Sequence, residues 1–268
     1  MKYRDFRPAR LLCAAAAFLL PLAAAAQTSP HTVTTTKFTV EDASIGKTFY
    51  EDLVGMPELR RYVDEGRLVE PFMGWSEDGR MGLLAYTVKE TVKKSPHPVS
   101  VVLLPDLDAV GARFEAADQP FNLYELDGGL RLAIVTDPSG NAIELVEADG
   151  DPSVAGARLI VADREAVEEW FIQVFDAKVD NRIVTATFDE VFLELGEGMF
   201  VALYEPLGAD AGPQPKSEHP VVAIYSTEYD EVLKRIKAIG LPVRQRGDRV
   251  LFADDPSGNV VEVVRQSN

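Results

Sequence analysis

The sequence predicts an α+β fold made of two tandem repeats, each with two modules of one strand, one helix and three strands. Three observations lead to this prediction. The turn sequence Asp-Pro-Ser-Gly-Asn occurs at residues 137–141 and again at 255–259, between apolar runs. Segments 37–56 and 157–176 share an aspartate followed by an aromatic pair. A strand followed by a helix also recurs within each half, at 102–117 and 223–240. Matching spacings of this kind indicate an internal duplication.

The repeated turn predicts a hairpin near the end of each repeat. Asp at the first position, Pro at the second and Gly at the fourth suit a type I turn. The residues on both sides are apolar and often β-branched, which favours strands. We therefore expect strand, tight turn and strand over residues 134–147 and 251–264.

The helices are expected to begin after aspartates and to bury aromatic residues. Asp42 and Asp163 precede amphipathic runs, and Gly55 suits the end of the first. We expect the aromatic pairs to pack behind a sheet; they are Phe49-Tyr50 and Trp170-Phe171. A stretch rich in turn-forming residues, 148–154, separates the repeats, so the expected domains are residues 35–148 and 155–266.

The N-terminus reads as a secretory signal peptide over residues 1–26. Four basic residues precede the apolar segment 11–26, which ends in small residues that suit cleavage before Gln27. The apolar run is too short for a retained membrane anchor. We therefore expect a periplasmic or secreted protein that is not held in a membrane. Its only cysteine, Cys13, would leave with the leader, so we expect neither thiol chemistry nor disulfides.

The charge of the chain restricts its partners. The net charge is −16 at pH 7, with 43 acidic against 27 basic residues. A surface this acidic is a poor partner for nucleic acid or for anionic membranes. It favours a neutral or cationic ligand over an anion.

Glu144 and Glu262 are the most informative charged residues, because each follows a repeated turn and lies within an apolar strand. Side chains alternate along a strand, so Glu144 shares its face with Ala142 and Val146. A buried carboxylate needs a hydrogen-bond donor, a cation or a metal, or else it is protonated. We expect both carboxylates to face the protein interior. The alternative is that each reaches solvent at the rim of a sheet.

These residues resemble the vicinal oxygen chelate superfamily, which includes glyoxalase I, extradiol dioxygenases, and bleomycin- and fosfomycin-resistance proteins. The resemblance lies in an Asp seven residues before Phe-Tyr, the glycine after it, and the pattern Asp-Pro-x-Gly-Asn-x-x-Glu. It covers nearly the whole chain after the leader. It implies four βαβββ modules forming two tandem cup-shaped mixed-sheet domains, each glyoxalase- or bleomycin-resistance-like, with a ligand or metal inside each cup.

By the same resemblance, a metal would take ligands from the first and last strands of each module, usually His or Gln and then Glu. The matching positions are Thr35, about Leu84, about Val99 and Glu144, then Gly156, about Ala202, about Val221 and Glu262. Only the two glutamates fit. His97 and His219, each followed by Pro, could join Glu144 and Glu262 in weak sites for a divalent ion such as Zn, Ni, Fe or Mn. The alternative is a solvated histidine at a strand entrance.

We therefore expect an exported protein that binds a small organic molecule without a catalytic metal or another cofactor. The candidate ligand-binding residues are Glu144, Glu262, Tyr86, Tyr204 and Thr35, with the two tyrosines at matching positions in the repeats. No catalytic residue can be named. One alternative is a divalent-metal-dependent enzyme, either a glyoxalase I-like lyase or an extradiol dioxygenase-like protein. The other is a structural or interaction module whose cups are filled by side chains.

Overall fold

The computed structural model describes residues 29–87, 97–126, 128–211 and 219–267. The expected leader and the expected start at Gln27 lie outside these residues. The described part contains four modules of one strand, one helix and three strands, which confirms the predicted fold class.

The first repeat supplies two modules. Module 1 contains β1 (His31–Thr39), α1 (Ala43–Phe49), the π-helical turn η1 (Tyr50–Val54), β2 (Glu58–Asp64), β3 (Leu68–Ser76) and β4 (Gly79–Tyr86). Module 2 contains β5 (Ser100–Leu104), α2 (Leu107–Ala116), β6 (Asn122–Glu125), β7 (Arg131–Thr136) and β8 (Ala142–Glu147).

The second repeat supplies the other two modules. Module 3 contains β9 (Ser153–Ile160), α3 (Arg164–Phe175), β10 (Lys178–Val184), β11 (Phe188–Glu194), β12 (Phe200–Pro206) and the short turn η2 (Gly208–Asp210). Module 4 contains β13 (Pro220–Ser226), α4 (Tyr229–Ile239), β14 (Val243–Arg246), β15 (Val250–Asp254) and β16 (Val260–Arg265).

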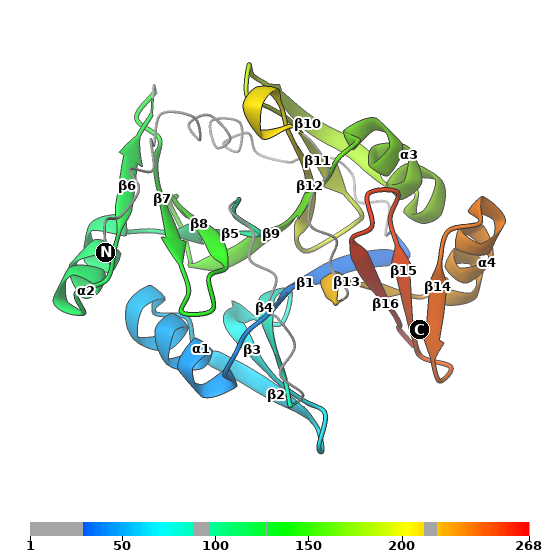
Figure 1. The fold of residues 1–268 in the computed structure, drawn as a ribbon, viewed down its shortest axis with the longest axis horizontal. Helices are drawn as coiled ribbons and strands as arrows, with labels where there is room; N and C mark the ends of the chain where they lie inside the picture. The colour runs from blue at the N-terminus through cyan, green and yellow to red at the C-terminus, as the bar shows by residue number, and fades with distance from the viewer. Residues whose placement is uncertain (1–28, 88–96, 127, 212–218, 268) are drawn as a thin grey trace.

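The modules combine into two eight-stranded sheets, and each sheet takes one module from each repeat. Sheet A has the order β14-β15-β16-β13-β1-β4-β3-β2, so it joins modules 1 and 4. Sheet B has the order β10-β11-β12-β9-β5-β8-β7-β6, so it joins modules 2 and 3. Figure 1 shows the blue β1 beside the orange β13. The resemblance led us to expect each cup within one repeat, and that pairing is wrong.

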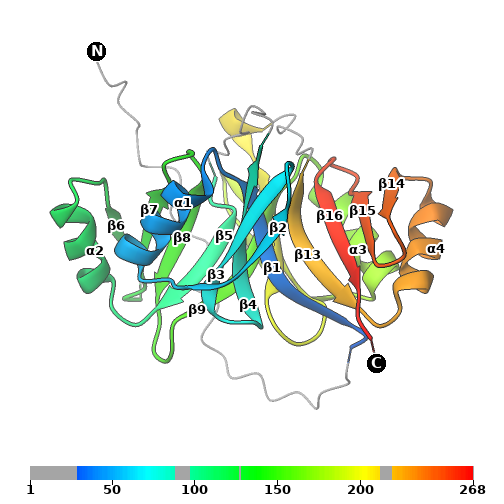
Figure 2. The ribbon, with the colours of Figure 1, turned by 90° about the horizontal axis from the view of Figure 1, so that it is seen from below.

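The helices cover one face of the sheets and leave the other face concave. Figure 2 shows α2 and α4 at opposite outer ends of the molecule. We name the concave face of sheet A cup A and that of sheet B cup B. The edge strands of sheet A come close enough for Arg246 on β14 to donate to Asp64 on β2 at 2.5 Å. Sheet A therefore curves until its two edges nearly meet.

One hydrophobic core lies behind both sheets and beneath all four helices. Its buried residues come from every module. The expected aromatic pairs all belong to it; they are Phe49, Tyr50, Trp170 and Phe171. On β1, Phe38 belongs to this core, so the neighbouring Lys37 points to the opposite, concave face. The same alternation on β9 puts Leu159 in the core and Arg158 in the cup.

The helices are short and begin where the sequence predicts. The side chain of Asp42 accepts hydrogen bonds from the first turn of α1, and Asp163 caps α3 in the same way. Gly55 ends the first helix in a left-handed conformation, with φ of 82°. In the part of the chain that the structure describes, no helix has the length and apolar character needed to span a membrane.

The repeated turn holds the two modules of one repeat together across the two sheets. The Gly140 N–H donates to the Asp137 carbonyl at 2.8 Å, and Gly140 has a φ of 90°, which favours glycine. Asn141 Nδ2 donates to Asp137 and also to the Thr39 carbonyl, at 3.0 Å, at the end of β1. The second turn repeats this arrangement with Asp255, Asn259 and Ile160. The turn residues thus have a structural role.

Candidate functional site in the two cups

Cup A contains a lysine held between two glutamates. Lys37 on β1 places its Nζ 2.6 Å from Glu262 on β16 and 2.9 Å from Glu70 on β3. The side chains of Lys37 and Glu70 are 7% and 5% exposed, and that of Glu262 is 13% exposed. An ammonium so far from water is tolerated because two carboxylates surround it.

Cup B contains the same arrangement with an arginine. Arg158 on β9 donates from Nε to Glu190 on β11 at 2.6 Å and from Nη1 to Glu144 on β8 at 3.3 Å. Its Nη1 also donates to the carbonyl of Pro98 at 3.4 Å. The side chains are 3%, 0% and 7% exposed for Arg158, Glu190 and Glu144. We call each group of one cation and two glutamates a cup triad.

The two cup triads occupy matching places in the fold. Lys37 and Arg158 lie on the first strands of modules 1 and 3, and Glu70 and Glu190 lie on the third strands of the same modules. Glu144 and Glu262 lie on the last strands of the modules that complete each cup. The duplication therefore produced two copies of one charged site, each assembled from both repeats.

Burial and pairing act on these groups in opposite directions. Burial lowers the pKa of Lys37, but Glu262 and Glu70 outweigh it and raise the pKa overall. Arg158 behaves in the same way beside Glu144 and Glu190, so both cations stay charged. Burial raises the pKa of Glu190 to about 7, although Arg158 opposes the change. Burial also raises the pKa of Glu70, against the effect of Lys37.

A glycine makes room for the triad in cup A. A Cβ atom on Gly82 would lie 2.5 Å from Glu70 Oε1 and 3.3 Å from the Lys37 side chain. Gly82 pairs with Lys37 across β1 and β4, and Ala202 pairs with Arg158 at the equivalent place in sheet B. Cup B therefore accommodates a side chain where cup A needs a glycine.

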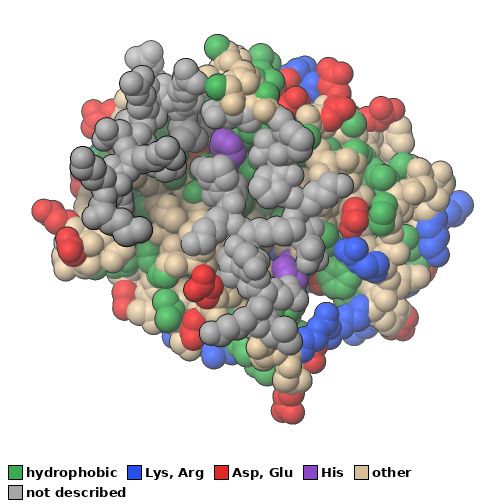
Figure 3. Space-filling view, viewed as in Figure 1, with side chains coloured by type: hydrophobic (Ala, Val, Ile, Leu, Met, Phe, Trp, Pro, Cys, Tyr) green, Lys and Arg blue, Asp and Glu red, His purple; other side chains and the backbone are tan. Residues whose placement is uncertain are grey.

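The candidate tyrosines pack against the two histidines, one from each repeat. Tyr86 stacks on His219 with ring centres 4.3 Å apart, and Tyr204 meets His97 at 5.0 Å. Tyr204 also stacks on Phe188 at 5.0 Å. The rings of His97 and His219 thus lie beside aromatic groups. Figure 3 shows histidine side chains at two separate points of one face of the molecule.

The two tyrosines are not at equivalent positions, which corrects the prediction. Tyr204 pairs with Ile160, two residues after Arg158, whereas the residue in the same place beside β1 is Leu84. Tyr86 lies two residues further along β4 than Leu84. The two-residue difference keeps both tyrosines on the concave face, which is why the sequence pattern made them look equivalent.

The strand register also shows that several positions matched to the family's metal ligands were misplaced along their strands. In sheet A, the residues level with Glu262 are Ala223, Thr35 and Arg80. In sheet B, those level with Glu144 are Val101, Gly156 and Phe200. Four expected positions therefore lie two or four residues along their strands from the residues in register with Glu262 or Glu144; they are Leu84, Val99, Ala202 and Val221. Strand bulges between Val33 and Thr35 and between Val101 and Val102 explain part of the error.

These residues do not fit a divalent metal ion. At the level of Glu262, Arg80 supplies a positive charge and Ala223 supplies no ligand atom. At the level of Glu144, the ring of Phe200 covers Gly156, because a Cβ there would lie 2.0 Å from the ring. Among the described residues, no group of three or more His, Cys, Asp or Glu is arranged to hold a metal. Catalytic metal sites ordinarily need three protein ligands.

Glu144 and Glu262 face the cups, as predicted, and Thr35 is fully buried on β1. Their role in binding a ligand stays a prediction. The remaining members of the triads were not predicted from the sequence; they are Lys37, Glu70, Arg158 and Glu190. A signal for them was present. Arg158 follows Lys37 by the same 121 residues that separate Asp163 from Asp42, and Glu190 follows Glu70 by 120.

Cup A is lined by basic and aromatic groups. The guanidinium of Arg60 lies 4.1 Å from the centre of the Phe72 ring, and that of Arg80 lies 5.4 Å from it. Arg80 is 4% exposed and donates to the hydroxyl of Tyr225 at 3.1 Å. Figure 3 shows Lys and Arg side chains gathered at the lower right of the face it presents. The lining of cup A is therefore basic and aromatic, and Glu77 pairs with both Arg60 and Arg80.

Cup B is lined mainly by apolar groups. One cluster lies on the module 2 side and includes Val101, Leu132 and Val146. A second lies on the module 3 side and joins Phe188 to Tyr204, with Ile160 and Ile183 packed against them. The Arg158 triad shares strands with both clusters, since Glu144 lies on β8 with Val146 and Glu190 lies on β11 with Phe188. Its charges are therefore surrounded by apolar side chains.

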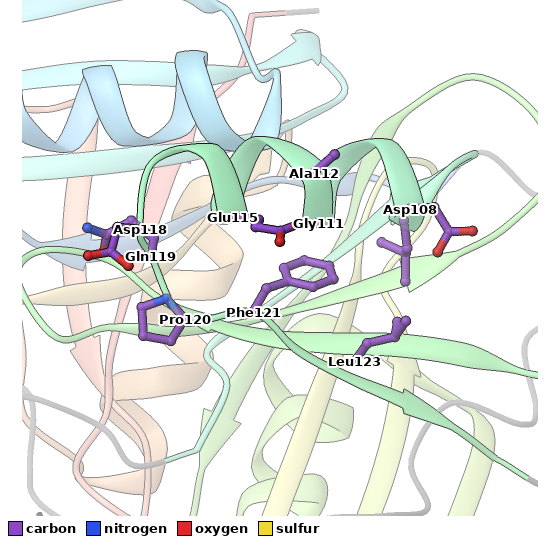
Figure 4. Close-up of a pocket in the computed structure, with 10 residues that line it drawn as sticks. Asp108, Gly111, Ala112, Glu115, Asp118, Gln119, Pro120, Phe121 and Leu123 are labelled. Atoms are coloured by element: carbon purple, nitrogen blue, oxygen red, sulfur yellow. The ribbon is translucent and has the colours of Figure 1, made fainter.

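A shallow groove lies outside both cups, between α2 and β6. Its volume is about 710 Å³, and Phe121 and Leu123 lie along it with Asp108, Glu115 and Asp118. Figure 4 shows the Phe121 ring pointing toward the helix at Gly111. A Cβ on Gly111 would lie 3.1 Å from that ring, so the glycine permits the close approach.

Comparison with solved structures identifies the fold. Glyoxalase I from Zea mays superposes with a TM-score of 0.70 at 17% identity, over 88% of this chain and 92% of that one. A putative dioxygenase from Bacillus subtilis superposes with a TM-score of 0.66 at 14% identity, over 91% of this chain and 87% of that one. No protein-family model and no curated protein sequence matches the chain. At these identities the likeness concerns the fold alone. The chain therefore has the fold of the vicinal oxygen chelate superfamily, with four βαβββ modules in one polypeptide.

Proposed function

We propose that this protein binds a small organic molecule in a cup and uses no catalytic metal there. The observation that carries the proposal is the pair of cup triads. Lys37 lies between Glu262 and Glu70, and Arg158 lies between Glu144 and Glu190. In each cup, a cation of the chain already neutralises the glutamate that the family pattern would offer to a metal.

Electrostatics supports metal independence. A divalent ion beside Glu262 would lie close to the ammonium of Lys37, and repulsion between like charges in a buried site is large. The same repulsion applies beside Arg158. Neither cation is expected to lose its proton to make room, because the pKa of each is raised by its glutamates.

The ligand is proposed to be neutral or cationic, on the evidence of the net charge of −16. The candidate contacts are Glu144, Glu262, Tyr86, Tyr204 and Thr35. We also propose that the protein is exported and that its leader is removed before Gln27. An intact mass that matches a chain beginning at Gln27 supports export, and an intact mass that matches a chain beginning at Met1 contradicts it.

A thermal-shift screen tests the binding function. The mature protein is screened against neutral and cationic aromatic compounds, with and without a chelator. Ligands that bind only the folded state raise the unfolding temperature. We expect at least one compound to do so equally in both conditions. A shift that the chelator abolishes would favour the metal-dependent enzyme, and the absence of any shift would favour a structural module with filled cups.

A further inference from the structure

The carboxyl group of Glu190 distinguishes cup B from cup A. Oε1 of Glu190 accepts from Arg158 Nε at 2.6 Å, but Oε2 is buried and has no hydrogen-bond partner. The residue is 0% exposed. A buried polar atom without a partner is rare in a folded protein and marks a place where a further group can bind. The equivalent Glu70 in cup A also has a buried oxygen without a hydrogen-bond partner, Oε1, but that atom lies 2.9 Å from the ammonium of Lys37.

The surroundings of this oxygen are aromatic and apolar. Glu190 pairs with Tyr204 across β11 and β12 and with Ile183 across β10 and β11. Phe188, two residues earlier on the same face of β11, stacks on Tyr204. Aromatic rings and one polar acceptor are the usual composition of a site for a small aromatic molecule.

The charge beside Glu190 restricts the group that can meet it. Arg158 is held at 2.6 Å from the other oxygen and stays charged. A second cation would be repelled by the guanidinium in this buried setting. A neutral O–H or N–H donor avoids that repulsion and satisfies the acceptor.

Building on the binding function proposed above, we propose that cup B takes an aromatic molecule whose neutral hydrogen-bond donor contacts Oε2 of Glu190. The donor is a hydroxyl or an N–H group, and the ring lies against the Phe188 and Tyr204 wall. Glu190 is thus a specificity-determining residue, whereas the buried oxygen of the equivalent Glu70 in cup A lies beside the ammonium of Lys37.

This arrangement makes binding depend on pH. A donor stabilises the ionised carboxylate more than the protonated one, so affinity falls when Glu190 gains a proton. The pKa of Glu190 is about 7, so affinity is expected to fall as the pH decreases from about 8 to about 6. The charged or titratable groups facing Glu190 are Arg158, Glu144 and Tyr204, with His97 in contact with Tyr204. His97 is the other group able to titrate in this range, so the variant His97→Asn is a control.

The test uses two probes that share one ring and differ in the donor, 4-methylphenol and 4-methylanisole. Calorimetric titration of the mature protein measures both affinities, and the wild type is expected to prefer the phenol about tenfold. Glu190→Leu is expected to abolish the preference. Glu190→Gln, which keeps the shape and an acceptor, is expected to remove the pH dependence. The matched control in cup A, Glu70→Gln, is expected to change neither.

Several outcomes overturn this inference while leaving the proposed binding function standing. One is equal affinity for both probes. Another is loss of the preference in Glu70→Gln instead of in Glu190→Leu. A third is loss of the pH dependence of binding in His97→Asn. Failure of both probes to bind also overturns it for this ligand class. The proposed binding function itself falls only if the broader screen finds no ligand or if binding requires a metal. Circular dichroism of Glu190→Gln and Glu190→Leu checks that the variants are folded.

Discussion

The two cups share one charged frame and differ in almost everything around it. Cup A uses Lys37, whose compact ammonium lies between two carboxylates above Gly82. Cup B uses Arg158, which reaches two carboxylates and a backbone carbonyl beside Ala202. Arginine has five fixed donors and lysine has a single charged centre. The comparison indicates that a buried cation between two glutamates is the common element, and that the surrounding side chains have diverged.

The divergence is greatest in the lining and at the sheet edges. Cup A has Arg60 and Arg80 against Phe72, and its edge strands are joined by Arg246 and Asp64. Cup B is apolar, and among the described residues no ion pair joins its edge strands β6 and β10. Two sites with the same triad can therefore present different surfaces to a ligand, because function depends on what lines the site as well as on the fold.

The largest effect is expected from removing a triad cation. Lys37→Met leaves Glu70 and Glu262 buried without a partner, and breaking a buried pair in this way costs about 3–5 kcal/mol. Arg158→Met should cost a similar amount in cup B. Urea unfolding measures both. Adding Glu70→Gln and Glu262→Gln to Lys37→Met should restore much of the loss. A cost below about 1 kcal/mol would show that the triads contribute little to stability.

The second-largest effect is expected in the pH dependence of stability that Glu190 gives to cup B. Because burial raises the pKa of Glu190 to about 7, protonated Glu190 is favoured in the folded state. The stability that protonated Glu190 contributes is fully present at a pH below the pKa of this residue in the unfolded chain. It is lost as the pH rises through 7, by up to about 3 kcal/mol. The free energy of unfolding should therefore depend less on pH in Glu190→Gln than in the wild type. Urea unfolding at about pH 5 and about pH 8 measures the difference. An unchanged pH dependence in this variant would contradict the assignment.

A smaller effect is expected from exchanging the small residues beneath the cations. Gly82→Ala places a Cβ 2.5 Å from Glu70 Oε1, so crowding should cost about 1–3 kcal/mol. The reverse change in cup B, Ala202→Gly, removes a methyl group and should cost about 1 kcal/mol or less. Thermal unfolding of both variants checks the asymmetry. If Gly82→Ala is neutral or stabilising, the triad of cup A has more room than the structure shows.

The smallest effect concerns the closed edge of cup A. Asp64→Asn removes the ion pair with Arg246 and a longer one with Arg67, both near the surface, so the cost should be at most about 1 kcal/mol and should shrink with added salt. Unfolding at low and high salt measures it. The control is Asp254→Asn, which removes an ion pair within one edge of the same sheet. A salt-independent loss well above that of the control would mean that the edge contact holds the cup together.

Much of the fold was predictable because its signals are local. The turns, the capping aspartates and the aromatic pairs repeat at fixed spacing, and each acts within a few residues of itself. The pairing of modules was not predictable from those signals, since β1 could join the last module of either repeat with the same pattern. The strand order shows that it joins β13.

The site was predictable in part for a related reason. Glu144 and Glu262 stand out because each interrupts an apolar strand next to a repeated turn. Arg158 lies among apolar residues and Lys37 follows three threonines, but a charged residue near a strand end usually reaches solvent, so their burial depends on partners from another module. Only the assembled sheets bring Glu262 to Lys37 and Glu144 to Arg158.

The measurement that tests the central claim most directly is the metal content of the mature protein after equilibration with Zn²⁺, Ni²⁺ and Mn²⁺. Elemental analysis by mass spectrometry after gel filtration gives the number of ions bound per chain. If Lys37 and Arg158 neutralise the cup glutamates, the wild type should retain well below one ion per chain. One or two tightly held ions per chain, lost in Glu144→Gln and Glu262→Gln, would contradict the account.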